Sequence, residues 1–127
     1  MNEKEITERL KKELGEVDLK SIDKNKLAKE LEHMYVCIKN EYKYSMPLLE
    51  SIYIVGSFAE GSAIKTVSDL DIRYVVQSEP VKEQIDFVKQ YSKRNWERHL
   101  SDYDLLFGYV DAGLSYKKPK TTHIKIK

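Results

Sequence analysis

Cysteine, proline and glycine are scarce in this 127-residue chain, which has one cysteine, three prolines and five glycines. The lone Cys37 excludes an internal disulfide framework and a cysteine-based zinc cluster, and we expect it to be a small core residue. So little proline and glycine argues against low-complexity or collagen-like structure. No apolar run approaches the ~18 residues of a membrane span, and the N-terminal residues lack the pattern of a signal peptide. We therefore expect a soluble, cytoplasmic protein that does not contact membranes.

The charges that are present form a gradient along the chain. The net charge is only +1, from 22 basic and 21 acidic residues. Residues 1–45 are balanced, residues 46–113 have more acids than bases, and residues 114–127 carry five lysines and no acid. The chain length fits one compact domain over residues 1–127. An acid-rich middle suits a site that concentrates carboxylates, and the basic tail is expected to be a solvated edge, with RNA binding as the alternative.

The first half of the sequence predicts helices. Apolar residues recur every four positions between Glu3 and Leu14, and Gly15 follows where helices often end. A longer helix is predicted from about Asp23, a plausible N-cap, to about Tyr44. Its apolar face is expected to be core, with a dimer or docking surface as the alternative. Residues 1–46 are thus expected to be an N-terminal helical extension.

The second half changes to a strand-like pattern. Strands are predicted over residues 51–55, 70–76 and 103–110, with a half-exposed edge strand at 122–127. A helix is predicted from Pro80 to about Leu100, capped by Glu79 or Ser78. The predicted fold class is α/β (α+β), a small mixed sheet flanked by helices.

An acidic pair begins the second of these strands. Asp69 and Asp71 are two residues apart, so on a strand they project from the same face with Cα atoms about 6.6 Å apart. Their carboxylates can converge on one or two metal ions, and without a cation they would repel one another. Oxygen ligands favour Mg²⁺ or Mn²⁺ over zinc.

A Gly-Ser pair follows the first predicted strand. Gly56 lets the backbone approach a ligand closely because it has no Cβ. Ser57 adds a hydroxyl donor where a strand turns into a helix, and exposed backbone N–H groups at such a corner favour phosphate. Together with the acidic pair, this corner predicts a site for a metal-bound triphosphate.

A third acid is expected on a neighbouring strand. Asp104 is the candidate, and Asp102 is the alternative because it has the same parity. The role expected for this residue is to bind metal and to accept the proton of an attacking hydroxyl.

The segment GSFAEG at residues 56–61, followed six residues later by SDLDI at 68–72, resembles the signature of the DNA polymerase β-like nucleotidyltransferase superfamily. The resemblance covers about residues 51–110, and by size the chain is most similar to the minimal, single-domain members. It implies a polymerase β-like catalytic core over residues 51–127. It also implies transfer of a nucleotidyl group from an NTP, which we expect to be ATP, to a hydroxyl of a protein, an RNA or a small molecule.

The resemblance also implies roles for individual residues. Two Mg²⁺ ions, or Mn²⁺, would be bound by Asp69, Asp71 and Asp104. The nucleotide would be held by the Gly-Ser corner and by two residues of the following segment: Gly56, Ser57, Lys65 and Ser68.

One observation keeps another hypothesis open. Many minimal members carry an arginine in the Gly-Ser loop, where this chain has Phe58 and Glu60. The alternative is therefore a catalytically weak or inactive nucleotide-binding module that docks a partner protein, or forms a homodimer, through the N-terminal helices.

The histidines His33, His99 and His123 have no ligand spacing and are expected to take no part in a site.

Overall fold

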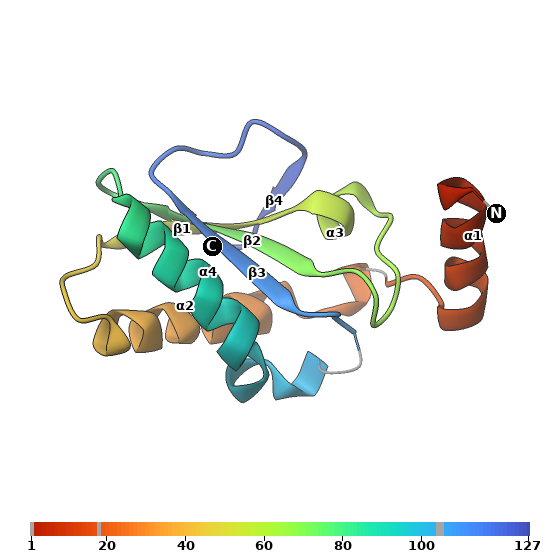
Figure 1. The fold of residues 1–127 in the computed structure, drawn as a ribbon, viewed down its shortest axis with the longest axis horizontal. Coiled ribbons are helices and arrows are strands. Elements are labelled where there is room, and N and C mark those ends of the chain that lie inside the picture. Colours follow the sequence, from red (N-terminus) through yellow and green to blue (C-terminus); the bar gives the residue numbers. More distant parts are fainter. Residues whose placement is uncertain (1, 18, 104–105) are drawn as a thin grey trace.

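The computed structural model describes residues 2–17, 19–103 and 106–127, and Figure 1 shows its fold. The first half of the chain, up to residue 48, is helical apart from its connecting segments. In the second half, helices separate the first three strands and the last strand follows the third directly. The elements are α1 (Glu3–Leu14), η1 (Leu19–Ser21), α2 (Lys24–Glu41), β1 (Leu49–Val55), α3 (Gly56–Glu60), β2 (Leu70–Val76), α4 (Lys82–His99), η2 (Ser101–Tyr103), β3 (Val110–Ser115) and β4 (His123–Lys125).

The described strands form one mixed sheet in the order β3-β2-β1-β4. β1 pairs antiparallel with both β2 and β4, whereas β2 and β3 are parallel. A parallel pair needs a long crossover, and α4 provides it between β2 and β3. The prediction of a small mixed sheet with helices is therefore confirmed, as is the edge position of the last strand.

The core lies between the sheet and two long helices, α2 and α4, which cover one face (Figure 1). Burial alternates over the first five residues of β2 and along β3, with apolar side chains inward and polar or small ones half-exposed, whereas the last three residues of β2 are all buried. The α2 face expected to be core is fully buried at Leu27, Leu31, Met34 and Ile38. Alternation places Asp71 and Asp111 on the half-exposed side of their strands.

Helix ends follow the capping rules in the first half of the chain. The Asn2 side chain accepts a hydrogen bond from the Glu5 N–H, and Asp23 accepts from two N–H groups at the start of α2. The predicted cap of α4 is wrong. That helix begins at Lys82 after Val81, and the Gln84 side chain accepts from the Val81 N–H at 2.8 Å.

The third strand is also misplaced by the sequence analysis. It was predicted over 103–110, but β3 occupies Val110–Ser115. Tyr103 ends the short helix η2, and Phe107 is buried against aromatic rings that include those of Phe58 and Trp96. Phe107 thus belongs to a core-packing connection, because its aromatic contacts bury it outside the strand.

The first helix, α1, lies to one side of the other elements (Figure 1) and has no buried residue. The segment after it is attached to the core by backbone contacts, which include the Val17 N–H to Ala63 O bond and the Lys65 N–H to Gly15 O bond. Among the described residues, no helix is long and apolar enough to cross a membrane.

Candidate functional site

Three aspartates meet where the parallel strands β2 and β3 begin. Asp71 is the register partner of Asp111 on β3, and Asp69 directly precedes β2. Partners on adjacent strands lie about 4.8 Å apart, so the Asp71 and Asp111 side chains are neighbours. All three residues are half-buried.

The three carboxylates interact electrostatically. Burial raises the pKa of Asp71, and the charges of Asp111 and then Asp69 raise it further. The interaction of the Tyr109 hydroxyl with the Asp69 carboxylate raises the pKa of Tyr109. Such a cluster of acids favours a bound cation, because a cation relieves both the burial and the repulsion.

Two basic side chains lie beside the acids. Lys89 of α4 is 3.9 Å from Asp111, and both Lys89 and Arg73 lower the pKa of Asp71. Arg73 extends over Gly113, where an added Cβ would be 3.0 Å from the Arg73 Nε. The site therefore combines three acids with two bases, an arrangement suited to a polyanion held through metal ions.

The Gly-Ser corner adjoins the same cluster. Gly56 opens α3 directly after β1 with φ +70°, the left-handed region that favours glycine. A Cβ added at Gly56 would be 2.5 Å from Oδ2 of Asp71. Any side chain here would therefore push into the carboxylate, and glycine is required both by its backbone angle and by its neighbour. Ser57 follows it and is half-buried.

Gly56, Asp71 and Asp111 border an open cleft with a volume of about 460 Å³, whereas Asp69 and Ser57 are not among the residues that line it. Its walls come from β1, α3, β2, α4 and β3, together with the segment before β4. The lining includes Gly56, Glu60, Asp71, Arg73, Lys89, Asp111 and Thr121. The cleft is large enough for a small ligand.

Two residues expected to contact nucleotide have other contacts. The Ser68 hydroxyl accepts a hydrogen bond from the Ile64 N–H at 2.8 Å, so it shapes the turn before Asp69. Lys65 is exposed, and its backbone N–H bonds to Gly15. The bases that act on Asp71 are Lys89 and Arg73, and Lys65 is not among the residues that line the cleft.

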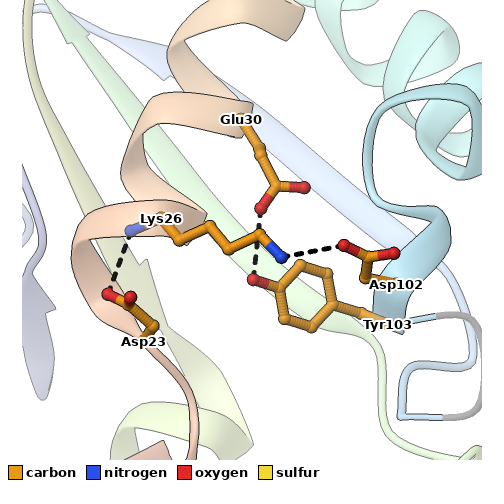
Figure 2. A network of polar contacts seen from close by, with 5 residues as sticks. All are labelled: Asp23, Lys26, Glu30, Asp102 and Tyr103. Carbon is orange, nitrogen blue, oxygen red and sulfur yellow. Dashed lines mark hydrogen bonds and ion pairs between the residues drawn. The ribbon is translucent and has the colours of Figure 1, made fainter.

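Asp102, the alternative third acid, belongs to a different polar network (Figure 2). Its carboxylate accepts a hydrogen bond from Lys26 Nζ at 2.8 Å, and this contact raises the pKa of Lys26. Beside it, the Tyr103 hydroxyl donates to Glu30, and burial followed by the charge of Glu30 raises the pKa of Tyr103 to about 12. The network joins η2 to α2, and the Asp102 side chain remains 65% exposed.

Asp104, the predicted third acid, lies outside the described residues. The sequence analysis missed Asp111, the acid that the structure places beside Asp71. Its signal is the strict alternation from Val110 to Ser115, with buried Val110, Ala112 and Leu114 between half-exposed residues. The longer apolar run just before this segment obscured that pattern.

Two of the histidines that are expected to take no part in a site lie close to Cys37. His33, Cys37 and His99 come together at one place between α2 and α4. His33 and His99 are far apart in the sequence, so their spacing gave no indication of this contact.

Comparisons with protein-family models, with curated proteins and with solved structures find no match for this chain.

Proposed function

We propose that this protein is a Mg²⁺-dependent nucleotidyltransferase with a polymerase β-like core, which transfers a nucleoside monophosphate from an NTP to a hydroxyl. The observation that carries the proposal is the meeting of Asp69, Asp71 and Asp111 beside Gly56. The resemblance of residues 56–72 to the nucleotidyltransferase signature supports it. Asp111 replaces Asp104 as the third acid in this proposal.

The donor set fits Mg²⁺ better than a softer metal. Asp69, Asp71 and Asp111 offer only carboxylate oxygens, which Mg²⁺ and Mn²⁺ prefer. The raised pKa of Asp71 supports this assignment, because a divalent cation would stabilise the three charges together. Bound there, Mg²⁺ would neutralise negative charge on the triphosphate during nucleotidyl transfer.

We assign the remaining roles in the proposed reaction from the positions of the residues around the three aspartates. Asp111 is the proposed acceptor of the proton from the attacking hydroxyl, since it lies beside Asp71 on the neighbouring strand. Lys89 and Arg73 would balance triphosphate charge, in place of an arginine in the Gly-Ser loop. Gly56 and Ser57 would present backbone and hydroxyl donors to the phosphates.

The proposed donor is ATP, and the proposed acceptor is a hydroxyl of a protein, an RNA or a small molecule. The cleft is open, with Glu60 and Thr121 among the residues that line it. An open cleft suits a macromolecular hydroxyl that approaches from outside.

Transfer from labelled ATP tests the proposal. The protein would be incubated with Mg²⁺ and ATP labelled at the α-phosphate, with cell protein or RNA as acceptor. We expect label in an acceptor and release of pyrophosphate. Asp71→Asn should reduce transfer by about 10²–10³-fold, because metal binding contributes several kcal/mol at the transition state. Asp102→Asn, the matched control, should retain full transfer.

A nucleotide-binding module that docks a partner is the second candidate. The acidic Glu60, at the end of α3, lines the cleft in the segment where many minimal nucleotidyltransferases carry an arginine. This candidate predicts Mg²⁺-dependent NTP binding without label transfer to any acceptor. Transfer in the labelling experiment would contradict it.

A further inference from the structure

Three metal-ligating side chains come together between α2 and α4. His33 and Cys37 are four residues apart on α2, so they lie on the same face of that helix, one turn apart. His99 is the last residue of α4. One ligand atom from each residue lies within 4.8 Å of the other two, and the two imidazole rings are 5.8 Å apart between centroids.

The cluster can be reached from solvent and is partly held in place. His33 is exposed, and Cys37 and His99 are half-buried. The Tyr91 hydroxyl is 3.0 Å from Nε2 of His99, a contact that restricts the orientation of the ring. None of the three ligating residues lines the aspartate cleft.

The donor chemistry differs from that of the aspartate cluster. One thiolate and two imidazoles suit Zn²⁺, whereas Mg²⁺ prefers oxygen ligands. Zn–S and Zn–N bonds of about 2.3 and 2.0–2.1 Å place the ligand atoms of a tetrahedral site about 3.3–3.7 Å apart. The three ligand atoms lie at most 4.8 Å from one another, which is close to that range.

We propose that His33, Cys37 and His99 form a Zn²⁺ site with three protein ligands and one position open to water. The site joins the second half of α2 to the C-terminal end of α4. Both helices pack on the sheet that carries the three aspartates, so zinc would stabilise the layer that supports the cleft. This site is independent of the proposed nucleotidyltransferase activity.

Spectroscopy with Co²⁺ and calorimetry with Zn²⁺ test the proposal on the tag-free, chelator-treated chain. We expect one Zn²⁺ per chain. We also expect a Co²⁺ complex with visible bands of tetrahedral intensity and a near-ultraviolet thiolate charge-transfer band, because Cys37 supplies sulfur. Zn²⁺ should raise the Tm of the wild-type chain.

Variants identify the ligands. Cys37→Ser and His99→Ala should each weaken Zn²⁺ binding at least about 100-fold, since even residues that only orient a ligand cost 10–100-fold. The charge-transfer band should disappear in Cys37→Ser. His123→Ala, the matched control on β4, should bind Zn²⁺ like the wild type. Circular dichroism of each variant establishes that it is folded.

Three results would overturn the proposal. One is stoichiometric Zn²⁺ binding that is unchanged in Cys37→Ser and His99→Ala. The second is a Co²⁺ spectrum without the thiolate band. The third is the absence of Zn²⁺ binding to the reduced wild-type chain.

Discussion

At the scale of single residues, Asp71 carries the most unfavourable electrostatics of the candidate site. Its carboxyl is half-buried and faces two other acids, and Lys89 and Arg73 offset this only in part, because its pKa remains raised. Repulsion among such carboxylates destabilises the folded state in the absence of cations, and bound cations relieve it. The charge of Asp71 therefore links the proposed metal to the stability of the fold.

Replacing this charge should change stability in opposite directions with and without metal. The folded pKa of Asp71 lies above the ordinary value of 3.8, so the folded state binds the proton more tightly than the unfolded chain. The stabilisation that the protonated Asp71 carboxyl contributes is therefore complete below pH 3.8, and it is lost as the pH rises through the folded pKa of Asp71. In EDTA at pH 7, Asp71→Asn should have a higher Tm than the wild type, and the difference should vanish at low pH.

In the same thermal scans, Mg²⁺ should reverse the order of the two Tm values. It should raise the Tm of the wild type and leave Asp71→Asn unchanged, because only the wild type has the complete acidic set. Asp102→Asn, which removes an exposed ion pair with Lys26, should behave like the wild type in both buffers. A lower Tm for Asp71→Asn in EDTA would contradict this account of the cluster.

Gly56 and Gly61 provide a matched pair of substitutions. Both have positive φ, so alanine at either position costs about 1–2 kcal/mol of backbone strain. Only at Gly56 does the added Cβ meet Asp71; at Gly61 nothing lies within 4 Å. We expect similar losses of stability from strain but a loss of Mg²⁺-dependent ATP binding in Gly56→Ala alone. Calorimetric binding measured for both variants checks this, and equal affinities would contradict it.

At the scale of elements, the position of β3 decides which acid reaches Asp71. β3 is an edge strand, and its Ala112 N–H donates to the fully buried Ser92 hydroxyl of α4 at 2.9 Å. The same hydroxyl donates to Lys89 O. Ser92 therefore joins α4 to the strand that carries Asp111.

Loss of this hydroxyl should loosen β3. Ser92→Ala leaves the buried Ala112 N–H unpaired, which costs about 1–3 kcal/mol. Urea unfolding should show this loss. The exposed Ser78→Ala is the control and should change stability by less than about 0.5 kcal/mol. Equal stability of Ser92→Ala and the wild type would mean that water or a shifted strand satisfies the Ala112 N–H.

Elements with regular periods and caps could be predicted from the sequence. The helix over Glu3–Leu14 and the start of α2 after Asp23 follow from apolar spacing and capping residues. The strand β3 could not be located, because Phe107 stands in an apolar run of the sequence but packs into the core ahead of the strand. Local patterns report burial, and only the tertiary fold decides whether buried backbone joins the sheet.

The same reason limits prediction of the site. Asp69, Asp71, Gly56 and Ser57 lie within one short segment, so their spacing could predict that Gly56 and Asp71 come together. Asp111 joins them through the β2–β3 register, a pairing across 40 positions of sequence that no local pattern contains.

At the scale of the whole molecule, the fold has one core and one peripheral helix. α2 is buried against the sheet and α4, whereas α1 has no buried residue. The apolar side chains of Ile6 and Leu14 in α1 are exposed, at 46% and 39%, so they contribute little to the core.

Removal of α1 should leave the core intact. A chain that lacks residues 2–14 but retains Gly15, which accepts a bond from Lys65, should change in unfolding free energy by less than about 1 kcal/mol. Leu31→Ala in α2 should instead cost about 2–5 kcal/mol. Thermal unfolding of both variants checks this, and failure of the shortened chain to unfold cooperatively would show that α1 belongs to the core.

The most direct test of the proposed function is calorimetric titration of ATP, with and without Mg²⁺, into the wild type and Asp71→Asn. The proposed site predicts binding that requires Mg²⁺ and is lost in the variant, with GTP, CTP and UTP ranked by the same titration. Absence of ATP binding in the presence of Mg²⁺, or equal binding to both proteins, would contradict it.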